Sequence, residues 1–145
     1  MAKPPLANIL IVDYDGELLQ ILKFVLEDAG YSVVESKSGE EALEKVASDP
    51  VDLVVLDVNL SGMSGLEVAR RLRATTPTSR VLIALHTGVE EASVRTEFVD
   101  YDLFMPKMDD ADALLTKVAD LLAKSRPADG STPTAEPTLT SVPSA

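Results

Sequence analysis

A short, mostly apolar run in the middle of the chain, Val51–Asp57, constrains the fold more than any other feature. Five of its seven residues are Val or Leu, and the run ends in a carboxylate, Asp57. A short β-branched run of this kind, bounded by turn residues, is typical of a strand buried on both faces, as in a parallel sheet. A Ser- and Gly-rich loop follows over residues 61–65, and apolar residues then recur at helical spacing from Leu66. Because sites form at the carboxyl ends of strands in open α/β sheets, Asp57 is a candidate functional residue.

The same order of strand, loop and helix recurs along the chain. Asn8–Asp13 is a second apolar run that ends in an acid, and three further apolar runs alternate with amphipathic segments. Regular alternation of buried strands and helices predicts an α/β fold, in which one parallel sheet is covered on both faces through right-handed crossovers. The predicted strands are 8–13, 31–35, 51–57, 81–85 and 101–105, and the predicted helices are 18–29, 38–49, 66–75, 90–98 and 111–124.

Composition narrows the classes of protein to which this chain can belong. Its 145 residues, 46% of them hydrophobic, are one domain's worth and can bury a sizeable core. The formal net charge of −11 repels phosphate backbones, so we expect no nucleic-acid partner. The chain has no cysteine, which excludes disulfides and thiolate metal sites and suits a reducing compartment.

Neither end of the chain predicts a membrane segment or a second domain. The N-terminal residues lack the apolar core of a signal peptide, and no apolar run approaches membrane-spanning length, so we expect a cytoplasmic protein with no membrane partner. Residues 125–145 are rich in Pro, Ser and Thr and cannot bury enough surface to offset their ordering entropy. We therefore predict one ordered domain over residues 6–124 and a disordered tail over residues 125–145.

Charged residues at the predicted strand ends form a candidate reactive cluster. Asp13 and Asp57 end two strands that would be neighbours in the sheet, and Lys107 lies just past the last strand. Carboxylates brought together repel one another unless a cation or a proton offsets them, and Mg²⁺ suits them because it takes oxygen ligands. A lysine opposite could hold an anion on Asp57, and Thr87 or His86 could hydrogen-bond that anion. These are the parts needed for phosphoryl transfer onto an aspartate.

The residues around this cluster resemble a known family. The stretches Ile9–Asp13, Val54–Leu60 and Gly62–Glu67 resemble the receiver domain of two-component response regulators. The resemblance covers about residues 8–122. It implies a flavodoxin-like (βα)5 fold, which is a three-layer sandwich around a five-stranded parallel sheet with the strand order 2-1-3-4-5.

The resemblance also implies roles for individual residues. Asp57 would be the phosphoacceptor, which takes a phosphoryl group from the phosphohistidine of a sensor histidine kinase or from a histidine phosphotransfer protein. Mg²⁺ would be held by the side chains of Asp13 and Asp57 and by the backbone carbonyl of Asn59. Lys107 would contact the phosphoryl group.

One acidic position departs from the family pattern. The family usually has two adjacent acids at the end of the first strand, and here the second position is Tyr14. We therefore expect weaker Mg²⁺ binding, unless Asp15 compensates. The alternative role for Asp15 is to cap the first helix.

The hydroxyl that the family places at the end of the fourth strand has three candidate positions here. Counting from the phosphoacceptor gives Thr87, matching the apolar run of the fourth strand gives His86, and counting back from the lysine gives Leu85. We predict Thr87 and leave the other two open. Either of those would remove or change the usual contact between hydroxyl and phosphate.

Three functions fit these residues. The first, which we predict, is a stand-alone response regulator in a phosphorelay; it is not an enzyme, and it signals through a downstream protein effector or a homodimer. The second is a degenerate receiver that acts as a phosphorylation-independent binding or dimerisation module. The third is a haloacid-dehalogenase-like phosphatase, because Leu10–Gly16 is similar to the first motif of those enzymes. That third alternative leaves the stretch around Asp57 unexplained.

Overall fold

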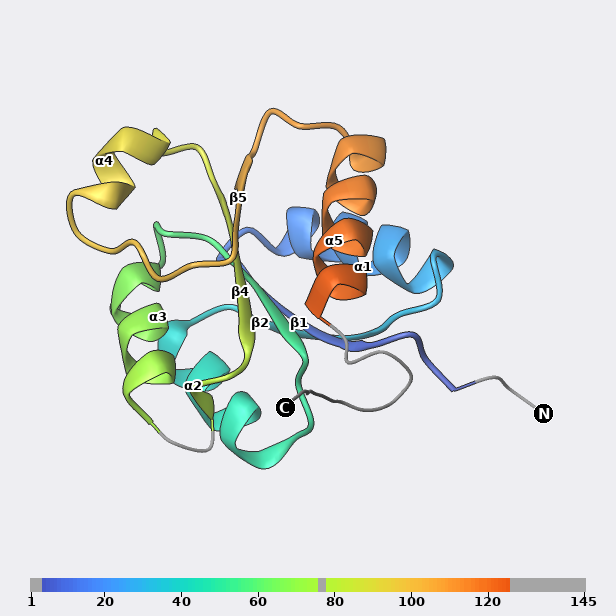
Figure 1. Cartoon of the computed structure of the whole chain (residues 1–145), viewed down its shortest axis with the longest axis horizontal. Helices are drawn as coiled ribbons and strands as arrows, with labels where there is room; N and C mark the ends of the chain where they lie inside the picture. Colours follow the sequence, from blue (N-terminus) through green and yellow to red (C-terminus); the bar gives the residue numbers. More distant parts are fainter. Residues whose placement is uncertain (1–3, 76–77, 126–145) are drawn as a thin grey trace, which may run out of the picture.

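The computed structural model describes residues 4–75 and 78–125. Within them, five parallel strands form one sheet in the order β2-β1-β3-β4-β5, and helices connect the strands (Figure 1). This confirms the flavodoxin-like (βα)5 sandwich predicted from the sequence. The elements are β1 (Asn8–Val12), α1 (Gly16–Asp28), β2 (Ser32–Ser36), α2 (Gly39–Ser48), β3 (Leu53–Leu56), α3 (Gly65–Ala74), β4 (Leu82–Thr87), α4 (Glu91–Arg95), β5 (Leu103–Pro106) and α5 (Ala111–Ser125).

Two hydrophobic clusters hold the helices on the sheet. α1 and α5 cover one face, while α2 and α3 cover the other, with α4 at its edge (Figure 1). Successive residues of a strand alternate between the clusters: Leu10 and Val12 pack under α2 and α3, whereas Ile9 and Ile11 pack under α1 and α5. Because the side-chain period of a strand is two, this alternation also decides the face to which each strand-end residue points.

β4 extends further than its apolar pattern predicts. The predicted strand ended at Leu85, but β4 continues through His86 and Thr87, which pair with Met105 and Pro106 of β5. Pairing is made by backbone groups, so the polar side chains at this end of the strand do not stop it. As a result, His86 and Thr87 are strand residues and point to opposite faces.

α4 and α5 also differ from their predicted bounds. α4 has only five residues, where the sequence predicts a helix over 90–98, and no side chain caps its N-terminus with a hydrogen bond. α5 includes Ser125, which is one residue beyond the predicted end of the ordered domain. The remainder of the predicted tail, residues 126–145, lies outside the described residues.

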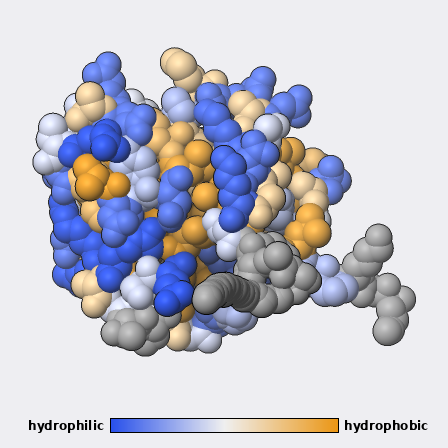
Figure 2. Space-filling model, in the orientation of Figure 1, coloured by the Kyte–Doolittle hydropathy of each residue, from blue (hydrophilic) through white to orange (hydrophobic). Residues whose placement is uncertain are grey.

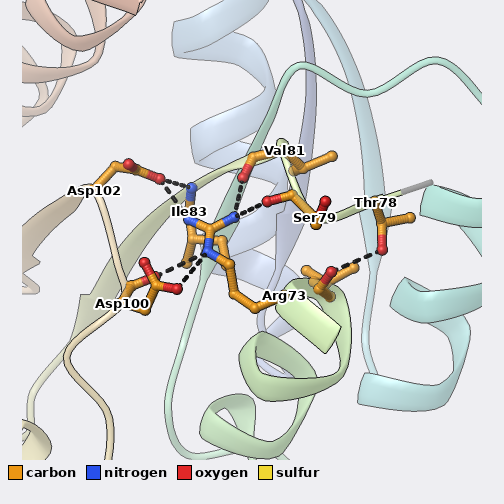
Figure 3. Close-up of polar contacts among 8 residues, drawn as sticks. Arg73, Thr78, Ser79, Val81, Ile83, Asp100 and Asp102 are labelled. Carbon is orange, nitrogen blue, oxygen red and sulfur yellow. Dashed lines mark hydrogen bonds and ion pairs between the residues drawn. The ribbon is translucent and has the colours of Figure 1, made fainter. Parts of the chain in front are cut away.

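One arginine ties α3 to the segments that enter β4 and β5 (Figure 3). Arg73, near the C-terminus of α3, forms an ion pair with Asp102 at 2.7 Å and has a side chain that is only 15% exposed. Asp102 Oδ2 accepts a further hydrogen bond from the backbone N–H of Ile83, at 2.9 Å. The Arg73 guanidinium also donates to the backbone carbonyls of Ser79, Val81 and Asp100. We call this arrangement, at the amino ends of β4 and β5, the Arg73 clamp.

The surface is mostly hydrophilic on the face shown in Figure 2. The hydrophobic side chains that reach the surface gather near the middle of this face, where Figure 1 shows β5 and β4 between α4 and α5. β5 is an edge strand, so partly buried apolar residues there are expected. Over residues 4–75 and 78–125, no helix has the length and apolar character needed to cross a membrane.

Candidate functional site

Two buried carboxylates and one lysine meet at the carboxyl edge of the sheet. Lys107, the residue after β5, places its Nζ 2.7 Å from Asp57 Oδ2 and 2.9 Å from Asp13 Oδ2. The side chains of Asp13 and Asp57 are 2% and 3% exposed, whereas that of Lys107 is 30% exposed. The three residues that the sequence singled out are therefore in direct contact, and the lysine forms the solvent-facing side of the group.

Strand alternation explains why these side chains converge. Asp13 follows β1, Asp57 follows β3 and Lys107 follows β5, and each continues the series of residues that faces α1 and α5. His86, inside β4, belongs to the same series. Four strand ends therefore direct a polar side chain to the same side of the sheet. The residues two positions earlier, Ile11, Val55, Ala84 and Met105, all belong to the cluster under α1 and α5.

The loop after β3 fixes the Asp57 carboxylate and backbone. The backbone N–H of Asn59 donates to Asp57 Oδ1 at 3.1 Å, and the backbone N–H of Asp57 donates to the carbonyl of Val12 at 3.0 Å. Gly65, the first residue of α3, lies so close that a Cβ there would be 1.9 Å from the Asp57 carbonyl oxygen. Only glycine allows this approach, so α3 begins directly against the backbone of Asp57.

The cluster keeps its lysine charged and retains an excess of negative charge. Burial lowers the pKa of Lys107, but its close contacts with the Asp57 and Asp13 carboxylates and their negative charges outweigh it, so the pKa stands above its ordinary value. One ammonium thus faces two carboxylates. Asp13 Oδ1 accepts a hydrogen bond from the backbone N–H of Asp15. Asp13 Oδ2, however, is buried and has only the ion pair with Lys107, without the geometry of a hydrogen bond.

Comparison with known proteins identifies the family. A family model described as the response regulator receiver domain matches residues 9–119. The chain belongs to the receiver family of response regulators. The matched residues include the whole stretch around Asp57, which the phosphatase alternative left unexplained.

Curated relatives of this receiver include longer regulatory proteins. The response regulator MprA of Mycolicibacterium vanbaalenii is 38% identical over 125 residues, which are 85% of this chain and 53% of that protein. The transcriptional regulatory protein GlrR of Escherichia coli K12 is 34% identical over 123 residues, which are 84% of this chain and 28% of that protein. The chain therefore spans about half the length of MprA, and a smaller share of GlrR.

Solved structures agree with the receiver fold. The chemotaxis response regulator CheY4 of Vibrio cholerae superimposes with a TM-score of 0.74 at 26% identity, over 79% of this chain and 98% of that one. A CheY-like response regulator receiver domain protein of Methanospirillum hungatei superimposes with a TM-score of 0.73 at 29% identity, over 82% of this chain and 95% of that one.

The acidic residues of the receiver fit a hard cation such as Mg²⁺. Asp13 and Asp57 supply carboxylate oxygens, among them the buried Asp13 Oδ2 that lacks a hydrogen bond. The described residues contain no group of three or more His, Cys, Asp or Glu side chains that could hold a metal. Mg²⁺ keeps several waters and is commonly bound through one or two carboxylates, so this pair is sufficient. The backbone carbonyl of Asn59 stays a predicted third ligand.

The residues that follow Asp13 add no second acid to the receiver's site. The Tyr14 side chain is 61% exposed. Asp15 is the N-cap of α1, and its carboxylate accepts hydrogen bonds from the backbone N–H groups of Glu17 and Leu18, at 3.1 and 3.3 Å. Of the two alternatives for Asp15, the structure has the helix cap. Of the acids considered, Asp13 and Asp57 are the ones that contact Lys107 in the cluster.

The end of β4 separates the three candidates for the switch position. Leu85 is fully buried in the cluster under α2 and α3. Thr87 follows on that same face, and its Oγ1 accepts a hydrogen bond from the backbone N–H of Val89 at 3.2 Å. His86 lies between them and points to the opposite face, which carries Asp57 and Lys107. Strand alternation thus brings His86 to the face that carries the acidic cluster, while the predicted Thr87 lies on the opposite face.

His86 lies within range of the charges of the cluster. Burial lowers the pKa of its ring below the ordinary 6.5, and the charge of Lys107 lowers it further, while the charges of Asp13, Asp57 and Asp109 act in the opposite direction. The ring is therefore neutral at pH 7. Counting in steps of two along the fourth strand would have placed this residue, but the apolar pattern ends the strand at Leu85, two residues before the end of β4.

Proposed function

We propose that this receiver accepts a phosphoryl group on Asp57 in a two-component phosphorelay, from a sensor histidine kinase or a histidine phosphotransfer protein. A carboxylate oxygen of Asp57 attacks the phosphorus of the donor's phosphohistidine. The P–N bond breaks, its electron pair goes to the donor's imidazole, and an aspartyl phosphate remains on Asp57. The observation that supports this most is the 2.7 Å contact of Lys107 Nζ with the buried Asp57 carboxylate.

Three groups around Asp57 have separate tasks. Lys107 is positioned to neutralise the phosphoryl oxygens, because its ammonium already lies against the accepting carboxylate. The backbone N–H of Asn59 orients Asp57 Oδ1. Asp13 together with Asp57 would hold Mg²⁺, which supplies further positive charge to the phosphoryl oxygens when it is bound. No base is required, since an ionised carboxylate attacks directly.

The output that we propose is a change in protein contacts. Replacing a carboxylate by an acyl phosphate raises the negative charge of the cluster by about one unit. Lys107 would then exchange part of its contact with Asp13 for the phosphoryl group. Since Lys107 lies between β5 and α5, this exchange reaches the surface there, where a downstream protein effector or a second copy of the chain would read it. We place these events in the cytoplasm, as is typical of the family.

The direct test is intact mass after incubation with Mg²⁺ and acetyl phosphate. We expect one phosphate adduct on the native chain and none on Asp57→Asn. Asp120→Asn, which makes the same change on the exposed face of α5, should be labelled like the native chain. Labelling that survives in Asp57→Asn would overturn the assignment of the phosphoacceptor.

A degenerate, phosphorylation-independent receiver is the second candidate, and Tyr14 is the observation that favours it. With a tyrosine in place of the usual second acid, the cation is held by two carboxylates only. If acetyl phosphate does not label the folded chain and Mg²⁺ does not bind to it, the degenerate receiver replaces the phosphorylated receiver as the proposed function. Mg²⁺ titration monitored by thermal unfolding makes that measurement on the same sample.

A further inference from the structure

The side chain of His86 is buried without a polar partner beside the acidic cluster. The residue is 4% exposed. Among the residues that the structure describes, no hydrogen bond or ion pair to its ring is found. The buried side-chain nitrogen and oxygen atoms without a hydrogen bond are Asp13 Oδ2 and Ser36 Oγ, so the ring nitrogens of His86 are not fully enclosed. The ring can therefore take a hydrogen-bond partner that enters the site.

The sheet register fixes where the ring points. His86 pairs with Met105, and Lys107 stands two positions after Met105 on the same face. The pairing continues past the end of β5, because the backbone N–H of Lys107 donates to the carbonyl of Thr87 at 3.0 Å. The imidazole and the ammonium therefore project side by side from neighbouring strands. Lys107 Nζ in turn contacts Asp57.

The hydroxyl of Thr87 is engaged elsewhere. Its Oγ1 already accepts a hydrogen bond from the backbone N–H of Val89, in the turn that leads to α4. Thr87 also lines a groove of about 850 Å³, together with Phe104, Pro106 and Lys107. Strand alternation places the Thr87 side chain on the face of the sheet opposite to His86. A contact with a group on Asp57 would require Thr87 to leave this arrangement.

We propose that His86, and not Thr87, is the β4 residue that contacts the phosphoryl group on Asp57, by donating a ring N–H to one of its oxygens. This inference rests on the proposed function, because it needs an aspartyl phosphate to contact. An imidazole extends further from the backbone than a hydroxyl does, so it reaches the phosphoryl group while the turn after β4 keeps its hydrogen bonds. The contact gives the buried ring the partner that it lacks.

Because His86 is the only histidine in the chain, its ring can be observed without assignment. Long-range ¹H–¹⁵N NMR of the imidazole reports which ring nitrogen carries a proton and whether that nitrogen is hydrogen-bonded. Addition of Mg²⁺ and beryllium fluoride, a stable mimic of the phosphoryl group, should shift the ring signals of the native chain. It should leave those of Asp57→Asn unchanged. Unchanged ring signals in a native sample that carries the beryllium adduct by mass would overturn the inference.

A second test compares His86 and Thr87 through the rate at which their variants are labelled. Loss of a hydrogen bond to a charged group is worth roughly tenfold or more, so His86→Ala should slow labelling by acetyl phosphate by at least about that factor. His86→Gln, which keeps an N–H donor, should recover part of the rate. Thr87→Val should slow labelling less than His86→Ala does. The reverse order, with Thr87→Val slower than His86→Ala, assigns the role to Thr87.

The two arms separate this inference from the function on which it rests. If the native chain forms no adduct with acetyl phosphate or beryllium fluoride, the proposed function is wrong, and so is the inference that rests on it. If the adduct forms on Asp57 but the His86 ring does not respond, the inference alone fails. Should His86→Ala not fold, as judged by circular dichroism, the NMR arm on the native chain still decides the question.

Discussion

The two ends of the sheet hold buried charge in opposite ways. At the amino end, the Arg73 clamp surrounds one guanidinium with Asp102, Asp100 and three backbone carbonyls, so that each charge has partners. At the carboxyl end, Asp13 and Asp57 share a single ammonium, and one buried carboxylate oxygen has no hydrogen bond. Both groups join segments that are far apart in the sequence and set two carboxylates against one cation, but Asp100 and Asp102 are 72% and 33% exposed, whereas Asp13 and Asp57 are buried.

This difference separates a structural site from a reactive one. A buried charge without full compensation destabilises the fold, so its persistence in a folded domain points to a use other than stability. A cation that the chain does not supply would offset the excess negative charge at the carboxyl end. The amino end is complete in itself, so its contribution should appear in the free energy of unfolding and not in the chemistry.

The largest effect that we expect follows from breaking the Arg73 clamp. Arg73→Leu leaves Asp102 and three carbonyls without their donor, which should lower the free energy of unfolding by about 3 kcal/mol. Urea denaturation measures this loss. Labelling of the folded variant by acetyl phosphate should stay near the native rate, because the clamp lies at the other end of the strands. Arg71→Leu is the matched control, since Arg71 is exposed and pairs only with Glu67 on its own helix. Equal losses of unfolding free energy in Arg73→Leu and Arg71→Leu would contradict a structural role for the Arg73 clamp.

Replacing an aspartate by asparagine should change the free energy of unfolding in opposite directions at the two ends of the sheet. Asp102→Asn removes the charge that pairs with Arg73 and should cost about 1–2 kcal/mol. Asp13→Asn removes one of two carboxylates that compete for one lysine, while its amide oxygen can still accept from the backbone N–H of Asp15. We expect it to stabilise the metal-free protein by about 1 kcal/mol. Urea denaturation in EDTA compares the two variants directly, and two losses of the same sign would remove the contrast between the ends.

Mg²⁺ should stabilise the carboxyl end and nothing else. A cation that binds only the folded state adds about 1.4 kcal/mol at ten times its Kd, which appears as a rise in the unfolding temperature. The rise should vanish in Asp13→Asn and persist in Asp102→Asn. Thermal unfolding with and without Mg²⁺ tests this, with NaCl at the same ionic strength as the control. If Mg²⁺ still raises the unfolding temperature of Asp13→Asn, the cation binds at another site.

Most of this fold, and half of the site, could be read from the sequence. Apolar runs that end in Asp13 and Asp57, with helical spacing between them, were enough to predict the sheet and the neighbouring carboxylates. The position of His86 was harder to predict, because hydrophobicity does not show where a strand of mixed polarity ends, and one residue decides the face. The Arg73 clamp left no periodic signal at all. Its partners come from two loops and a helix, and loop geometry is set by tertiary contacts.

The smallest effect that we expect is the pH dependence that His86 contributes at the carboxyl end. Burial first, and then the charge of Lys107, hold the pKa of the folded ring below the ordinary 6.5, against the opposing charges of Asp13, Asp57 and Asp109. Between the folded and unfolded pKa values, the unfolded chain binds a proton that the folded chain does not. Stability should therefore fall as the pH drops below 6.5. In EDTA, His86→Gln should flatten this part of the curve of unfolding free energy against pH.

The acidic residues provide the control for that slope, because they act in a different pH window. The pKa of Glu41 is lowered from 4.5, chiefly by its hydrogen bond from the backbone N–H of Lys37, so the stability that it contributes is lost only as the pH falls below 4.5. His86→Gln should leave that lower part of the curve intact, and Glu41→Gln should leave the upper part intact. A slope near pH 6.5 that survives unchanged in His86→Gln would show that another group produces it, and the ring would then add no measurable pH dependence at the carboxyl end.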